Sequence, residues 1–241
     1  MKKTIGILGG MGPEATNYFF NLVLRQTRAG RDQEHIPVLI WSNPRIPPRT
    51  EAILHRGPSP LPLLVEGVKR LEQGGAGLIV VPCITAHHWA SEIAAAATVP
   101  FVDLINETVR CVAGKIPGLK KAGLVASSGT MAARIWHRAF EKRGIGIIVP
   151  ESKDQDAVMS AIFGKDGIKA GFASGRPRTA ILRVARRLIA RGAEAIIAGC
   201  TEVPLVLRKG DLPVPLIEPL AIGAFACIKR AGYETKDNGP L

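Results

Sequence analysis

Residues 80–88 read Val-Val-Pro-Cys-Ile-Thr-Ala-His-His, and residues 196–204 read Ile-Ile-Ala-Gly-Cys-Thr-Glu-Val-Pro. In both stretches a short aliphatic run ends at proline or a small residue, a cysteine comes next, and threonine follows within two positions. Such a run, bounded by turn formers, is typical of a fully buried strand in a parallel sheet. Cys83 and Cys200 are therefore predicted at the carboxyl ends of two strands, the edge where open α/β sheets bind ligands.

The two halves of the chain repeat the same order of features. Residues 2–8 resemble residues 120–125, and each segment leads into a turn of small residues. The separation of Gly6 from Cys83 equals that of Gly123 from Cys200, 77 positions in each case (83 − 6 and 200 − 123). Self-similarity at a fixed spacing is a signal of repeated structural units.

We therefore expect an α/β fold with two pseudo-symmetric domains, each a mainly parallel sheet flanked by helices. The expected N-terminal domain comprises residues 1–99 with 212–241, and the C-terminal domain comprises residues 100–211. Ligand sites favour domain interfaces, so the active site is predicted in the cleft between the domains, with one cysteine on each side.

The glycine-rich turn 9–13 follows a predicted first strand at residues 4–8. It lacks the G-x-G-x-x-G spacing of dinucleotide sites, and Pro13 removes a backbone donor, so its nucleotide signal is weak. A turn that brings backbone N–H groups near a carboxylate needs the same glycines and fits the sequence no less well.

Composition indicates a globular cytoplasmic protein. The chain has 241 residues, of which 46% are hydrophobic, so it can bury a substantial core. It opens without a secretory signal pattern, and no apolar stretch approaches the roughly 20 residues that cross a bilayer. Four cysteines without close pairing favour a reducing compartment over a disulfide framework. We expect no membrane partner.

The formal net charge of +12 is unusual. It is compatible with nucleic-acid binding, a basic surface, or a pocket that attracts small anions. The densest cluster, Arg183, Arg186, Arg187 and Arg191, lies opposite an apolar helical stripe and is predicted to be a solvated helix face. Because no nucleic-acid-binding motif accompanies it, we expect no nucleic-acid partner.

Two thiols facing one cleft allow few kinds of chemistry. They could be inert, form a disulfide, or ligate a metal, but zinc usually takes four ligands with close Cys pairs that this chain lacks. No metal is therefore expected. A further possibility is that one thiolate removes a proton from a carbon while the other thiol delivers one to the opposite face.

Several motifs together resemble the aspartate/glutamate racemase family, closest to its aspartate racemase branch. They are residues 6–16, 32–35, 43–50, 82–87, 167–171 and 199–202, and the resemblance runs from Met1 to about Ala226. It implies a racemase that needs no cofactor, acts on a small anionic amino acid, and forms a homodimer. Cys83 and Cys200 would be the acid/base pair.

The resemblance also implies the substrate contacts. Arg49 and Lys169 would bind the carboxylates, Arg49 as a bidentate clamp and Lys169 as a point charge. The remaining contacts to the α-carboxylate and amine would come from Met11, Ile84, Thr85, Ser128, Thr130, Thr201 and Glu202. His87 would either orient a neighbouring thiol or serve only the local structure. Backbone N–H groups after each cysteine would stabilise an enediolate-like transition state, and a helix N-terminal field would lower a cysteine pKa.

Ile84 departs from the family pattern, which has asparagine there; Pro48 replaces a common aspartate. Loss of the amide would cost about 1.5–3 kcal/mol of carboxylate binding. Aspartate is the expected substrate, with glutamate next. Ile84 keeps open a broader-specificity racemase, or an enzyme like maleate isomerases or decarboxylases of the wider superfamily. A non-enzymatic binder of anionic metabolites with structural cysteines also stays open, and nucleic-acid binding rests on charge alone.

Overall fold

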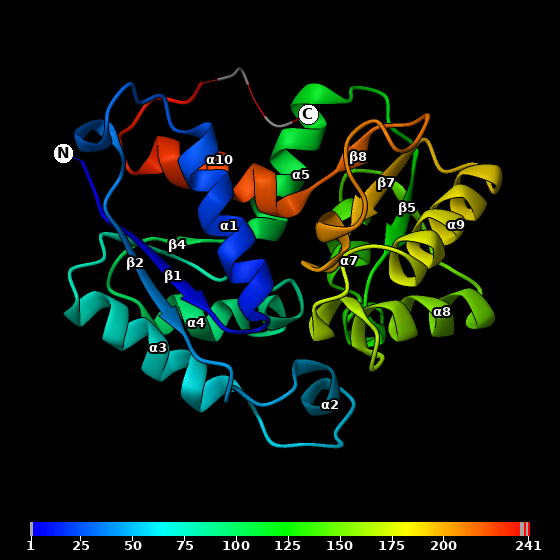
Figure 1. Cartoon of the computed structure of the whole chain (residues 1–241), viewed down its shortest axis with the longest axis horizontal. Helices are drawn as coiled ribbons and strands as arrows, with labels where there is room; N and C mark the ends of the chain where they lie inside the picture. Colours follow the sequence, from blue (N-terminus) through cyan, green and yellow to red (C-terminus); the bar gives the residue numbers. More distant parts are fainter. Residues whose placement is uncertain (1, 237–238, 240) are drawn as a thin grey trace.

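Two four-stranded parallel sheets lie side by side in the computed structural model, which describes residues 2–236, 239 and 241 (Figure 1). The first sheet has the order β2-β1-β3-β4 and the second has the order β6-β5-β7-β8. The strands of the first sheet are β1 (Ile5–Gly9), β2 (Val38–Ser42), β3 (Leu78–Val80) and β4 (Phe101–Val102). Those of the second are β5 (Lys121–Val125), β6 (Gly146–Ile148), β7 (Ala195–Ala198) and β8 (Leu216–Ile217). The expected α/β class with two parallel sheets is confirmed.

Equivalent residues of the two repeats make equivalent contacts. Gly6 pairs with Ile79 between β1 and β3, and Gly123 pairs with Ile196 between β5 and β7. A Cβ atom on Gly6 would lie 2.8 Å from the Cβ of Ala76, and one on Gly123 would lie 3.1 Å from the Cβ of Ala193. Both glycines thus permit the same close approach of a strand to the turn that precedes its neighbour.

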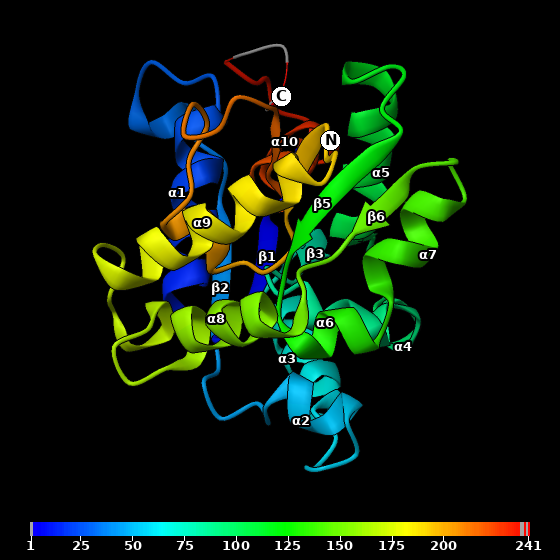
Figure 2. The ribbon, with the colours of Figure 1, turned by 90° about the vertical axis from the view of Figure 1, so that its right-hand side faces the viewer.

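Helices cover both faces of each sheet. They are α1 (Pro13–Gln26), α2 (Arg49–Ile53), α3 (Leu61–Gln73), α4 (Ala90–Ala96), α5 (Leu104–Lys115), α6 (Ser128–Ala132), α7 (Ile135–Glu141), α8 (Ser152–Phe163), α9 (Arg176–Ala190) and α10 (Pro219–Arg230). On the first sheet, α1 and α10 pack together on one face and α3 packs on β1 and β2. On the second sheet, α9 packs on β5 and β7 with α8 beside it, as Figure 2 shows.

The expected domain boundaries need correction at both ends. Strand β4 begins at Phe101 yet pairs with β3 of the first sheet, and β8 begins at Leu216 yet pairs with β7 of the second. The expected division at residues 99/100 and 211/212 therefore puts each fourth strand on the wrong side. The segment after β8 does return to the first unit, because α10 packs on α1. The chain thus passes between the units twice, before β5 and after β8.

The basic helix α9 has the predicted arrangement. Ile181, Val184, Ala185 and Leu188 are buried, whereas Arg183 and Arg186 are exposed. Its arginines therefore form the expected solvated face. Among the described residues, no helix has the length and apolarity that a membrane span requires.

Candidate active site

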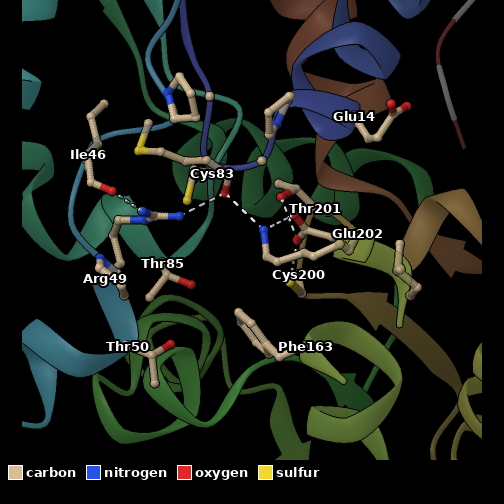
Figure 3. Close-up of a pocket in the computed structure, with 18 of the residues that line it drawn as sticks. Glu14, Ile46, Arg49, Thr50, Cys83, Thr85, Phe163, Cys200, Thr201 and Glu202 are labelled. Carbon is tan, nitrogen blue, oxygen red and sulfur yellow. Dashed lines mark hydrogen bonds and ion pairs between the residues drawn. The ribbon is translucent and has the colours of Figure 1, made fainter. Parts of the chain in front are cut away.

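A cavity of about 810 Å³ lies where the carboxyl ends of the two sheets meet, with walls from both units (Figure 3). Cys83 follows the end of β3 at Val80, and Cys200 follows the end of β7 at Ala198. Both cysteines line the cavity although only 4% and 5% of their surfaces are exposed. The predicted position of the two thiols, at strand ends and in one cleft, is confirmed.

The Cys83 turn is held by His87. The Nδ1 atom of His87 lies 2.9 Å from the Cys83 carbonyl oxygen, and the Leu104 N–H donates to Nε2 over 3.1 Å. Because Nε2 accepts, the proton lies on Nδ1, and the ring is a neutral imidazole that donates to Cys83. Burial lowers the pKa of His87, although nearby Asp103 opposes the shift. His87 therefore fixes the backbone of the Cys83 turn rather than orienting the thiol.

The surroundings of Cys200 favour its protonated form. Its thiol donates to Oε2 of Glu202 over 2.9 Å, and the Thr201 hydroxyl donates to the same oxygen over 3.2 Å. Burial raises the pKa of Cys200 well above the ordinary thiol value, and the Glu202 carboxylate adds to the shift while Lys169 opposes it. The expected lowering of a cysteine pKa by a helix N-terminus is wrong for Cys200.

The segment after Cys200 explains why its pKa is not lowered. Cys200 is followed by the 3-10 helix η4 (Val203–Leu205), whereas η2 (Thr85–Trp89) follows Cys83. A turn as short as η4 aligns few peptide dipoles, so it cannot offset the burial of the Cys200 thiol as a longer α-helix would.

Lys169 reaches the cavity from η3 (Ile168–Ala170) and forms a short ion pair with Glu202. Burial opposes the charged form of Lys169, but the Glu202 carboxylate outweighs it and raises the Lys169 pKa. The ammonium group therefore stays charged. Glu202 links it to the Cys200 thiol, a relationship that the separate motifs did not predict.

Arg49 begins α2 and is held by backbone oxygens. Its NH1 donates to the carbonyls of Ile46 and Pro47 at 3.0 and 2.9 Å, and its NH2 donates to Met11 O at 3.1 Å. The proline-rich loop thus holds the guanidinium in the lining of the cavity, which also includes Cys83 (Figure 3). Three of its five N–H donors already have partners.

The glycine-rich turn presents a carbonyl oxygen to two cationic side chains. The Gly10 N–H donates to the Thr16 hydroxyl over 2.9 Å, so it is used within the turn. Met11 instead presents its carbonyl oxygen, which accepts from Arg49 and, over 3.4 Å, from the Nζ of Lys169. Gly10 adopts φ +93°, and a Cβ there would lie 2.3 Å from the Asn43 backbone, so this tight path requires glycine.

The remaining predicted contacts divide into two groups. Ile84, Thr85 and Thr201 line the cavity with Met11, Arg49, Lys169 and Glu202. Ser128 and Thr130 lie outside this lining. Thr130 is fully buried and exchanges a hydrogen bond of 2.9 Å with the Thr85 hydroxyl, whereas the Ser128 hydroxyl accepts from Gln155. Thr130 thus supports a wall residue rather than facing the cavity.

Sequence reasoning missed several residues that line the cavity. They are Glu14, Ile46, Thr50, Glu51, Met159, Phe163 and Ile168. Thr50 directly follows Arg49, which could have suggested it, and it packs against Gly129 of the other unit. A Cβ on Gly129 would lie 2.6 Å from the Thr50 hydroxyl oxygen. Phe163 ends α8, and nothing in its local sequence distinguishes it from an exposed aromatic side chain.

Most of the chain is similar to known proteins. Residues 8–227 match the model of a family described as Asp/Glu/hydantoin racemase. The broad-specificity amino-acid racemase RacX of Bacillus subtilis (strain 168) is 26% identical over 238 residues, which cover 96% of this chain and 97% of that protein. The structure of Picrophilus torridus aspartate racemase is 30% identical, with a TM-score of 0.87, and the match covers 97% of this chain and 96% of that one. An aspartate racemase homologue from Pyrococcus horikoshii OT3 is 25% identical, with a TM-score of 0.76, over 96% of this chain and 100% of that one.

Proposed function

Because this chain belongs to the Asp/Glu/hydantoin racemase family and is an amino-acid racemase, we propose that it interconverts L- and D-aspartate by a two-base mechanism. Cys83 and Cys200 act as the acid/base pair, and no cofactor takes part. The observation that carries the proposal is that two cysteines, at equivalent positions of two repeated sheets, line a single cavity.

The two thiols have different resting roles. Cys200 starts as the protonated acid, since its thiol donates to Glu202 and its pKa is raised by burial. Cys83 is then the base, and it removes the α-proton of the enantiomer whose Cα–H faces it. Cys200 delivers its proton to the opposite face of the planar intermediate, which inverts the configuration. In the reverse direction the roles exchange.

The α-proton of an amino acid is far less acidic than a thiol, so the negative charge that develops on the carboxylate must be stabilised. Lys169 and the hydroxyl of Thr85 lie in the cavity wall and supply fixed donors for that charge. The raised pKa of Lys169 keeps it cationic throughout. Arg49, from the unit that carries Cys83, holds the side-chain carboxylate with the NH2 donor that the backbone carbonyls leave free, because its Nε atom is buried.

The test is incubation of the purified protein with L-aspartate in D₂O. We expect D-aspartate to accumulate and deuterium to enter at Cα; absence of both overturns the proposal. Cys83→Ala and Cys200→Ala should each lower the rate by about 10²–10⁴, the usual contribution of an acid or base. Cys111→Ala is the matched control, because Cys111 is a half-buried free thiol outside the cavity.

Broader specificity is the second candidate, and two observations favour it. Ile84 puts an apolar, buried side chain in the wall where the family has an amide. Three Arg49 donors are engaged by carbonyls, which weakens selection for a second carboxylate. RacX, to which the chain is similar, carries the name of a broad-specificity racemase. In a panel of acidic, neutral and basic L-amino acids, faster turnover of a monocarboxylic substrate than of aspartate would establish this candidate.

A further inference from the structure

Three buried hydroxyl groups meet where the two units join. Thr85 follows Cys83 in the first unit, whereas Ser127 and Thr130 follow β5 in the second. The Oγ1 atoms of Thr85 and Thr130 lie 2.9 Å apart, and the Ser127 Oγ lies 3.3 Å from Thr85 and 3.2 Å from Thr130. Thr85 is 8% exposed, and the other two residues are at most 1% exposed. The three hydroxyls therefore form a closed triangle that crosses the junction between the units.

The supply of protons limits the hydrogen bonds of this triangle. Each hydroxyl has one proton to donate and two lone pairs with which to accept. The Thr130 N–H donates to the Ser127 Oγ over 3.4 Å, and among the described residues no carbonyl or carboxylate accepts from any of the three hydroxyls. Their three protons therefore go to one another or into the substrate cavity, which Thr85 lines.

Two arrangements of the hydrogen bonds use all three protons. In one, the protons circulate around the triangle, and Thr85 offers only a lone pair to the cavity. In the other, Ser127 donates to Thr130, Thr130 donates to Thr85, and Thr85 donates into the cavity. A carboxylate in the cavity favours the second arrangement, because it accepts a charge-assisted hydrogen bond and each donor in the chain polarises the next. The charge of the ligand thus selects the direction of the hydroxyl chain.

We propose that Ser127 and Thr130 are positioning residues for racemisation, and that they act by aiming the Thr85 proton at the substrate carboxylate. Both lie outside the cavity lining, so they act through Thr85 and do not touch the substrate. The inference rests on the proposed racemase function. The donor belongs to the first unit and its direction is set by the second, so the hydroxyl chain is complete only when the units are apposed as in this structure.

The hydroxyl chain should contribute more to the rate than to substrate binding. Negative charge on the carboxylate grows as the α-proton leaves, so a donor held in one direction stabilises the transition state more than the bound substrate. Thr130→Val removes the hydroxyl that donates to Thr85 while it nearly retains the shape of the side chain. The Thr85 proton is then free to turn towards the Ser127 Oγ, 3.3 Å away, and the carboxylate loses a donor of fixed direction.

A double-mutant cycle in the racemisation of L-aspartate tests this route. We expect Thr130→Val to lower kcat by about tenfold and to raise KM less, and Thr130→Ser to restore kcat to within about threefold. In protein that already carries Thr85→Val, adding Thr130→Val should change kcat by less than about twofold, because the chain no longer has an end to aim. Thr108→Val is the matched control. Thr108 is fully buried and donates to the Leu104 carbonyl, so its change should affect stability and leave kcat unaltered. Circular dichroism verifies that each variant folds.

Equilibrium binding tests the hydroxyl chain without catalysis. The Cys83→Ala/Cys200→Ala protein retains the cavity but lacks both thiols, so L-aspartate can be titrated into it calorimetrically without turnover. We expect Thr130→Val to weaken this binding by about threefold or more, and to have no effect once Thr85→Val is present.

Three results would overturn the inference. One is an equal loss of kcat, or of aspartate affinity, from Thr130→Val with and without the Thr85 hydroxyl. A second is a loss in Thr130→Val that Thr130→Ser does not restore. The third is the absence of aspartate binding by the protein without the two thiols. The inference and the proposed function fail separately: the expected binding pattern without racemisation contradicts only the proposed function, whereas undiminished racemisation in Thr130→Val contradicts only the hydroxyl chain.

Discussion

The Cys200 thiol donates a hydrogen bond of 2.9 Å to the Glu202 carboxylate, which also pairs with Lys169. This contact keeps the proton on sulfur, because a thiolate at that position would lie against a negative charge. Glu202 therefore positions the protonated Cys200 thiol, and the two cysteines have different surroundings although their strands are equivalent.

Replacing Glu202 by glutamine should change the pH profile more than the fold. Burial still raises the Cys200 pKa in this variant, and the Lys169 charge still lowers it. The carboxylate that adds to the upward shift is gone, so the Cys200 pKa should fall. We expect the basic limb of kcat/KM, measured where Cys200 is the acid, to move to lower pH. Thiolate absorbance should report the same change. Glu66→Gln, which breaks an exposed ion pair with Arg70, is the control, and an unmoved limb in the Glu202 variant would contradict this role.

Arg49→Lys should remove the hydrogen bonds that fix the side chain of residue 49 to its loop. A lysine cannot donate in the plane to the carbonyls of Ile46, Pro47 and Met11 together, so the loop and the turn lose their common partner. We expect kcat/KM for aspartate to fall by about 10–100-fold, equivalent to one or two charge-assisted contacts. The exposed Arg56, changed to lysine, provides the comparison. Unaltered kinetics in Arg49→Lys would remove Arg49 from the site.

Ile84→Asn should increase selectivity for dicarboxylates. The amide adds a donor to the cavity wall, and we expect the ratio of kcat/KM for aspartate over alanine to rise by about tenfold. Ile84 is 1% exposed, so an unsatisfied amide would also lower the free energy of unfolding by about 1–3 kcal/mol. Ile84→Val retains the apolar wall and should leave the ratio unchanged. A ratio that stays constant in the asparagine variant would show that residue 84 does not select the substrate.

His87→Gln should alter how stability depends on pH. The folded-state pKa of His87 lies below its ordinary value of 6.5, so the neutral ring contributes stability above that pH. The contribution is lost as pH falls from 6.5 towards the lower folded-state pKa. We expect chemical denaturation of the unaltered protein to show this acid-side loss and the variant to lack it, with a cost of about 1–3 kcal/mol at neutral pH from the lost hydrogen bonds. His55→Gln, at an exposed histidine, should show the same loss of stability at acid pH as the unaltered protein. If His87→Gln also shows that loss, groups other than His87 cause it.

The sequence was sufficient to predict the buried strands, their repeat and the two cysteines. A buried strand requires a run of aliphatic residues, such as the one before Cys83, so the run can be recognised in the sequence. The equal spacings of Gly6 and Gly123 from the cysteines reflect equivalent packing in the two sheets. The domain boundaries failed because β4 and β8 are only two residues long. Strands of that length carry no periodic signal, and only their pairing in space assigns them to a sheet.

The sequence did not predict the electrostatics of the site. Whether Met11 presents its N–H or its carbonyl depends on a turn fixed by Thr16, a side chain several positions away. The raised pKa of Cys200 depends on burial and on the direction taken by Glu202 after a short 3-10 turn. Neither residue type nor spacing determines those directions, because both arise from contacts between segments far apart in the chain.

The two passages of the chain between the units, before β5 and after β8, restrict how the enzyme can open. A pair of covalent crossings acts as a pair of pivots, and relative motion about two pivots reduces to rotation around the single line that joins them. Substrate exchange would then follow one angular coordinate, along which the separation of the two sulfur atoms and the opening of the cavity change together. Product release and the alignment of the proposed acid with the proposed base would consequently be governed by the same movement.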